Sequence, residues 1–310
     1  MADEAAQGSA PPVPRQVEDP FAGPTEAAAG GEDYDPDLDE GLPDDDEGPN
    51  AEPGVPDGEH VEYDDETGMP VSKANFLNGK LHGEFVEYGP AGQPSMTATM
   101  KDGAPDGEVA LYDDDGVVTQ RSQYRDGKLD GETLLYENGQ VAQRVPYVDG
   151  HVQGTVSTFN AGVKAADIDY RDDKPNGRLV SYDEKGDVMS EMGMVDGQLD
   201  GTAIFYDNEG KPIRQSQYEN DGLEGQTLDY WDTGEVREYI SYQDNRLHGE
   251  QRQYDRDGHL QERSFYNAGR RQGDAVKYDK DGNIVTEEDE ASSGPKRRRL
   301  FGLFDDGSGE

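Results

Sequence analysis

A glycine and an aromatic residue recur together through most of this chain, at intervals of 23 to 25 residues. When each such glycine is counted as the start of a unit, an aromatic residue stands five positions later in all ten units, although aromatic residues make up only 8% of the chain. A period of this length is typical of repeat proteins, in which each unit buries its apolar surface only against its neighbours. The repeat-defining aromatic residues are Tyr63, Tyr88, Tyr112, Tyr136, Phe159, Tyr182, Tyr206, Tyr230, Tyr254 and Tyr278.

Each unit predicts two short strands joined by tight turns. A second glycine follows the aromatic residue after a short polar link, as in "DDDG" and "DKDG". Such links are typical of hairpin turns, because glycine adopts a positive φ at little steric cost. In the first strand, the residue two before the aromatic residue is usually apolar and shares its face, as Val86 does with Tyr88. We therefore expect an all-β fold, an elongated repeat array of stacked β-hairpins that forms a twisted antiparallel meander.

Composition divides the chain into three parts. Residues 1–57 hold 17 acidic side chains and one basic side chain, with many Pro, Ala and Gly residues, and we expect a disordered acidic arm. Residues 58–286 carry the ten repeats of about 24 residues. Residues 287–310 are predicted to be a flexible tail with a basic and apolar motif.

The formal net charge of −41 bears on the choice of partner. An acidic surface repels nucleic acid and anionic lipid and favours another protein with a basic surface, although solubility alone is the simpler interpretation. The chain has no cysteine, which excludes disulfides and cysteine-ligated metals. The first residues lack the apolar stretch of a signal peptide, and no run approaches the ~18 apolar residues of a membrane span, so we expect a cytoplasmic protein.

Units such as "NGKLHGEFVEYGPAGQ" and "RDGKLDGETLLYENGQ" resemble the MORN-repeat superfamily, and most of all the variant in bacterial YwqK-family antitoxins. The resemblance covers residue 58 to about residue 286. It implies a sheet-based binding scaffold and an antitoxin or immunity role in a bacterium. The chain departs from the best-known MORN pattern, because residues such as Phe85 and Val109 replace the glycine at the third position, which gives no support to a lipid-binding role. The turn before a unit also lacks its glycine at Asp173 and Asn245.

No pattern in the sequence indicates catalysis. Two of the five histidines, His82 and His248, occupy the same turn position in different units, which favours a role in the repeat. Neither a strained nucleophile turn nor a zinc-binding helix motif is present, so we expect no enzymatic activity and no cofactor.

Several acidic turns resemble fragments of a calcium loop: Asp113–Gly116, Asp255–His259 and Asp279–Asn283. A complete loop of that kind needs three spaced oxygen ligands and a distal bidentate Glu between two helices. These turns lack that Glu and lie between predicted strands. Turn formation by Asp and Gly is the simpler interpretation, and we expect no metal site.

Two groups of residues in the repeats are candidates for partner binding. Trp231 is the only tryptophan, and it either contacts a partner or packs over its neighbouring hairpin. Five apolar residues lie on the face of the first strands opposite the repeat aromatic residue, where they indicate either a covered second face or a binding surface. These five residues are Phe85, Leu111, Leu135, Leu179 and Phe205.

The tail "KRRRLFGLF" is a third candidate, since a basic cluster followed by bulky apolar residues can dock into a partner's groove or contact an anionic membrane. A tail that folds back on the acidic body is the alternative. Its candidate binding residues are Arg297, Arg298, Arg299, Leu300, Phe301, Leu303 and Phe304.

Together these patterns predict a non-enzymatic, protein-binding repeat scaffold. The most concrete role is that of an antitoxin, immunity or adaptor protein that neutralises or escorts a partner protein. The alternative is a structural scaffold that tethers an assembly or a membrane periphery through the C-terminal motif.

Overall fold

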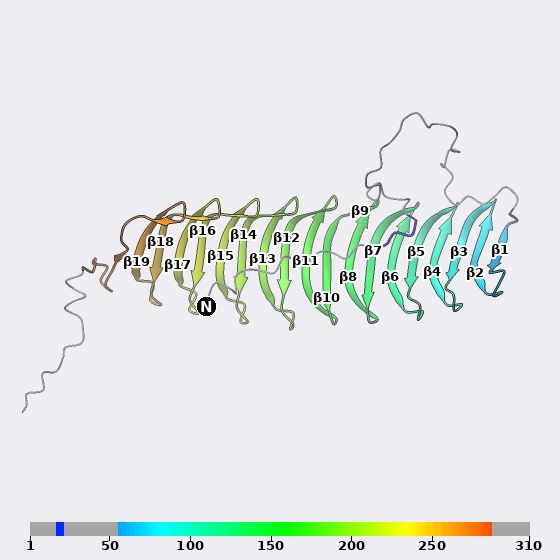
Figure 1. The fold of residues 1–310 in the computed structure, drawn as a ribbon, viewed down its shortest axis with the longest axis horizontal. Coiled ribbons are helices and arrows are strands. Elements are labelled where there is room, and N and C mark those ends of the chain that lie inside the picture. Colours follow the sequence, from blue (N-terminus) through cyan, green and yellow to red (C-terminus); the bar gives the residue numbers. More distant parts are fainter. Residues whose placement is uncertain (1–16, 22–54, 287–310) are drawn as a thin grey trace, which may run out of the picture. The chain divides into compact units, whose positions relative to one another are not determined.

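The computed structural model describes residues 17–21 and 55–286, and the chain divides into two compact units, residues 1–201 and 202–310. Every regular element in the described ranges is a β-strand, which confirms the all-β prediction (Figure 1). No helix long and apolar enough to span a membrane occurs in these ranges.

The strands of the first unit are β1 (Gly58–Tyr63), β2 (Pro70–Leu77), β3 (Lys80–Tyr88), β4 (Pro94–Lys101), β5 (Ala104–Tyr112), β6 (Val118–Arg125), β7 (Lys128–Glu137), β8 (Gln140–Val148), β9 (His151–Val152), β10 (Gly154–Asn160), β11 (Val163–Arg171), β12 (Lys174–Tyr182) and β13 (Val188–Val195). Strand β14 (Gln198–Tyr206) contains the boundary between the units. The strands of the second unit are β15 (Pro212–Glu219), β16 (Gly222–Tyr230), β17 (Val236–Gln243), β18 (Arg246–Tyr254), β19 (Leu260–Asn267), β20 (Arg270–Arg271) and β21 (Val276–Lys277).

Within each unit, a strand pairs antiparallel with the strand that follows it in the sequence. In the first unit this order runs from β1 to β13, with the short strands β9 and β10 both paired to β8. In the second unit it runs from β15 to β19, and β20 and β21 both pair with β19. The predicted antiparallel meander of hairpins is therefore confirmed within each unit.

From the second repeat onward, the turn that precedes each repeat places two residues at positive φ, as at Asn78 (54°) and Gly79 (75°). This is the geometry of the tight turn that matches the twist of a β-hairpin. Asp173 and Asn245 replace the usual glycine at φ values of 66° and 61°. Their side chains compensate for that less favourable conformation, because Asp173 Oδ1 accepts the backbone N–H of Val152 and Asn245 Oδ1 accepts that of Leu223.

The repeat aromatic residue marks an irregularity in strand pairing. The register shifts immediately before it in unit after unit, as between Glu87 and Tyr88 and between Leu111 and Tyr112. A bulge of this kind bends the strand and increases its twist. The fixed spacing of glycine and aromatic residue thus corresponds to a hairpin with a bulge at a constant position.

The larger buried cluster of the first unit lies on the face opposite the repeat aromatic residues. We call this surface the apolar face, and its buried side chains are Ala74, Leu81, Met96, Ala98, Met100, Val109, Tyr124 and Leu129. On the other face, Val86 and Ala110 are also buried. In this part of the sheet both faces therefore carry buried apolar residues, as the apolar positions on both sides of the first strands predict.

Candidate functional site

A short segment from near the N-terminus lies on the apolar face. We call residues 17–21 ("VEDPF") the docked segment. Its two apolar side chains, Val17 and Phe21, pack against the buried cluster of the apolar face. Figure 1 draws the segment in dark blue beside β6, the strand to which it is hydrogen-bonded. It belongs to the region for which the sequence predicted a disordered arm; for residues 1–16 and 22–54, which lie outside the described residues, that stays a prediction.

Gln120 on β6 holds the main chain of the docked segment. Its amide nitrogen Nε2 donates to the carbonyl oxygen of Glu18 at 2.6 Å, and its Oε1 accepts the Glu18 N–H at 3.1 Å. Gln120 is buried, and Nε2 also lies 3.0 Å from Ser122 Oγ, which orients the amide. A buried amide paired with both main-chain groups of one residue binds an extended backbone whatever its side chain is.

Asp19 shapes the next part of the segment. Its Oδ1 accepts the Phe21 N–H at 3.0 Å, which closes a turn over Pro20. The same oxygen accepts the Tyr124 hydroxyl at 2.8 Å. The Phe21 ring meets the Tyr124 ring edge to face, with 5.8 Å between the centroids and an angle of 80° between the planes. Tyr124 therefore recognises both the carboxylate and the aromatic ring of the segment.

Two phenols at this site, that of buried Tyr124 and that of half-buried Tyr147, have raised pKa values. Burial, supported by the hydrogen bond to the Asp19 carboxylate, raises the pKa of Tyr124 above its ordinary value. Burial raises the pKa of Tyr147 to about 12, and the nearby carboxylates of Asp173 and Asp19 add to this effect. Because both hydroxyls stay neutral, Tyr124 remains a hydrogen-bond donor to Asp19 throughout the physiological range.

Beside Phe21 the apolar face is hollowed into a cavity of about 700 Å³. Pro20 and Phe21 of the docked segment form one part of its wall. Val55 and strands β1 to β4 supply the rest, including Phe76, Leu81, Phe85, Met96 and Met100. This hollow has the size and the apolar lining with a few polar groups that are typical of ligand-binding clefts.

The five apolar candidates from the sequence lie in different surroundings. Phe85 and Leu111 are half-buried and pack against the cluster beneath the docked segment. Leu135 and Leu179 are 7% and 4% exposed, so they are core side chains that a partner does not reach directly. Phe205 is half-buried and belongs to the second unit. Their role in partner binding stays a prediction.

Trp231 lies after β16 and packs over its own hairpin and the next one. Its ring nitrogen Nε1 donates to the Tyr254 carbonyl at 3.2 Å. The guanidinium groups of Arg256 and Arg237 lie 5.0 Å and 5.8 Å from its ring centroid. The second alternative from the sequence, packing against a neighbouring hairpin, accounts for these contacts. The other candidate group, Arg297 to Phe304 in the tail, lies outside the described residues.

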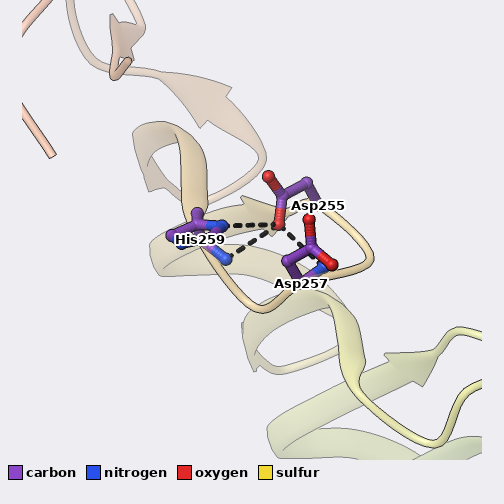
Figure 2. Close-up of side chains that lie close together, drawn as sticks. All are labelled: Asp255, Asp257 and His259. Carbon is purple, nitrogen blue, oxygen red and sulfur yellow. Dashed lines mark hydrogen bonds and ion pairs between the residues drawn. The ribbon is translucent and has the colours of Figure 1, made fainter. Parts of the chain in front are cut away.

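The acidic turn at Asp255 brings Asp255, Asp257 and His259 together (Figure 2). Asp255 Oδ1 accepts the backbone N–H groups of Asp257 and His259 at 3.0 Å and 2.9 Å. Aspartates at the same position of other units, such as Asp183 and Asp207, make the same pair of bonds without a histidine. Turn formation therefore accounts for the arrangement, and these hydrogen bonds hold the pKa of Asp255 below its usual value.

The residues that build the site at the docked segment were not among the candidates from the sequence. Val17, Asp19, Phe21, Gln120 and Tyr124 were all missed. One signal was present: Phe21 is the only phenylalanine in the first 57 residues, and it follows an Asp-Pro pair that favours a turn. Nothing in the repeat pattern distinguishes Gln120 from the polar residues of other strands.

Comparison with known proteins agrees with the hairpin architecture. No curated protein matches the chain. A family model described as MORN repeat variant matches residues 199–220 and 247–268, each of which begins two residues before a unit glycine. MORN repeats are in general protein- or membrane-binding units and typically have no enzymatic activity. Two of the ten repeats thus match the MORN repeat variant, in agreement with the resemblance of the units.

Proposed function

We propose that this protein is a non-enzymatic scaffold whose repeat sheet binds a partner protein through the apolar face, and that it neutralises or escorts that partner as an antitoxin, immunity or adaptor protein. The docked segment carries this proposal. A sheet face that holds an extended segment by its main chain, one carboxylate and two apolar anchors has the groups that peptide recognition requires.

The stiffness of the sheet and its charge support the same role. Strands paired on both sides lose little conformational freedom when a partner binds, so less of the contact energy is spent on ordering the surface. The repeat region from residue 58 to residue 286 holds 45 acidic and 23 basic side chains. Such a field accelerates association with a basic protein in the cytoplasm and disfavours nucleic acid.

An affinity capture with full-length baits tests this proposal. Phe85→Glu places a charge in the wall of the hollow, whereas Val71→Glu places one on β2 where the side chain is already 42% exposed. A third bait carries alanine at Arg297, Arg298, Arg299, Phe301 and Phe304. We expect one partner to be lost with the Phe85→Glu bait and retained with the other two baits. Those two baits should melt at the temperature of the wild type.

A partner lost only with the tail variant would contradict the proposal and favour the tethering scaffold. A partner captured through the face is then expressed alone and together with this chain. If this chain is an antitoxin, the partner expressed alone should arrest growth and co-expression of this chain should restore it. Unchanged growth with and without this chain would instead favour the adaptor role.

A further inference from the structure

We propose that the apolar face recognises partner segments of one chemistry, an apolar residue, any residue, Asp, Pro and an aromatic residue in that order, and that residues 17–21 occupy this site as an internal competitor. The inference rests on the proposed function and names the feature of the partner that this face selects. The occupant that we infer is therefore a linear segment of another protein, with the same anchors as "VEDPF".

The contacts separate what is specific from what is not. Gln120 pairs with the N–H and the carbonyl of Glu18, whose side chain is exposed, so this position accepts any side chain. Val17 fills an apolar contact on the buried cluster. An extended backbone with an apolar side chain at its start satisfies this part of the site.

The Asp-Pro-aromatic part is selective. Asp19 uses one oxygen both to close the turn at Phe21 and to accept the Tyr124 hydroxyl. Pro20 fixes its own φ and lowers the entropy lost on binding. The ring of Phe21 meets Tyr124 edge to face. Replacement of the aspartate by an uncharged residue without an acceptor leaves the Tyr124 hydroxyl unpaired against the segment, which disfavours binding.

The site is suited to exchange of its occupant. The docked segment, residues 17–21, is joined to β1 by residues 22–57. Because the segment and the apolar face belong to one chain, their contact depends on an effective local concentration that is set by the length of this connection. The cavity of about 700 Å³ adjoins Pro20 and Phe21. A partner segment that extends beyond its own aromatic residue fills this hollow with apolar side chains and gains contacts that displace the internal copy.

Fluorescence anisotropy with the full-length protein tests the inference. The probe is a labelled peptide with the sequence of residues 14–24, and a second peptide carries Leu-Leu in place of Ala22 and Gly23. The control peptide has alanine at the positions of Asp19 and Phe21. The proteins are the wild type, the variant Val17→Ala/Phe21→Ala, whose own segment is weakened, and that variant with Tyr124→Phe added.

We expect the Val17→Ala/Phe21→Ala variant to bind the probe at least about tenfold more tightly than the wild type does, because its internal competitor is weakened. The Leu-Leu peptide should bind both proteins more tightly than the probe. Tyr124→Phe should reduce the preference for the probe over the control peptide, because it removes the hydroxyl that Asp19 accepts and keeps the ring that Phe21 meets. Thermal melts monitored by circular dichroism check that each variant keeps the wild-type sheet. We expect the Val17→Ala/Phe21→Ala variant to keep it, because both residues lie outside every strand.

Equal binding of the probe and the control peptide by the Val17→Ala/Phe21→Ala variant would overturn the inference. A wild-type chain that sediments as a dimer, with this variant monomeric, would also overturn it, because the occupant would then be a second copy. Neither result decides the proposed function. If a partner is captured in a Phe85-dependent way but the probe does not bind, the apolar face binds its partner by another chemistry.

Discussion

The side-chain amide of Gln120 forms two hydrogen bonds with the main chain of Glu18, a residue 102 positions earlier, at 2.6 Å and 3.1 Å. The two residues form a closed pair in which each supplies one donor and one acceptor. Through this pair, a segment outside the repeats is fixed to a definite strand, β6 (Figure 1).

Gln120→Met is expected to release the docked segment and to leave the sheet folded. Met keeps the volume of the side chain and loses both hydrogen bonds to Glu18. Hydrogen exchange at the Glu18 amide should accelerate at least about fivefold, which corresponds to the ~1 kcal/mol typical of one net hydrogen bond. Gln123→Met, at an exposed position on the same strand, is the matched control and should leave that exchange unchanged.

Gly131→Ala is expected to destabilise the first unit more than Gly139→Ala does. Both glycines have positive φ, at 123° for Gly131 and 76° for Gly139. A Cβ added at Gly131 would lie 2.8 Å from Gln123 Cβ, whereas a Cβ added at Gly139 would meet no neighbouring atom within 4 Å. We expect a loss of roughly 2–3 kcal/mol in the free energy of unfolding for Gly131→Ala and roughly 1 kcal/mol for Gly139→Ala. Urea denaturation measures the difference, and equal losses would contradict the steric argument.

Asp229 is the buried centre of an ion cluster in the second unit, with its side chain 3% exposed. It accepts Arg214 Nε at 2.6 Å and Arg214 Nη2 at 3.0 Å, and Arg237 Nη2 at 3.1 Å. Asp229→Ala leaves a buried cavity and removes the acceptor of both cations, so we expect a loss of about 3 kcal/mol in unfolding free energy.

Asp232→Ala is the matched control for this cluster. Asp232 pairs with Arg256 at 2.7 Å, but both side chains are more than half exposed, and such pairs contribute at most about 1 kcal/mol. Denaturation midpoints that shift equally for the two variants would show that burial of Asp229 does not strengthen its ion pairs.

His151 is predicted to titrate above its ordinary range. Its Nδ1 lies 2.7 Å from Asp173 Oδ2, and this hydrogen bond raises the pKa of His151. Desolvation raises the pKa of Asp173, but the hydrogen bonds from His151 and Val152 outweigh it and lower that pKa. The histidine contribution to stability is full below its unfolded pKa of about 6.5 and is lost as pH rises through its higher folded pKa. The aspartate contribution is lost as pH falls through its depressed folded pKa.

The chemical shifts of the His151 ring, followed by NMR through a pH titration, measure this coupling. Asp173→Asn should return the pKa of His151 toward its ordinary value, because the charge of the acceptor is removed. His259 in the turn after β18 serves as an internal reference that the substitution does not touch. A His151 pKa that is unchanged by Asp173→Asn would contradict the assignment.

The repeat unit could be read from the sequence because its signals are local. Hairpin turns need positive φ at fixed places, and residues such as Gly79 and Gly103 supply it within two positions of the strand that they start. Strand alternation then assigns each side chain to a face, as with Val86 and Phe85. The number of units, the antiparallel order and the candidates Phe85 and Leu111 all follow from patterns that span no more than one period.

Burial and the docked segment depend on contacts between distant parts of the chain. Leu135 and Leu179 are buried where each lies between paired residues of the two adjacent strands, Gln120 and Gln143 beside Leu135 and Ile168 and Met192 beside Leu179. Asp229 is a buried carboxylate because Arg214 stands opposite it on the adjacent strand. Val17 to Phe21 bind Gln120 and Tyr124 because the stacked strands assemble a surface with the right donors and apolar contacts. That surface exists only after the hairpins have stacked, so the sequence determines the repeat and the tertiary structure determines what the repeat holds.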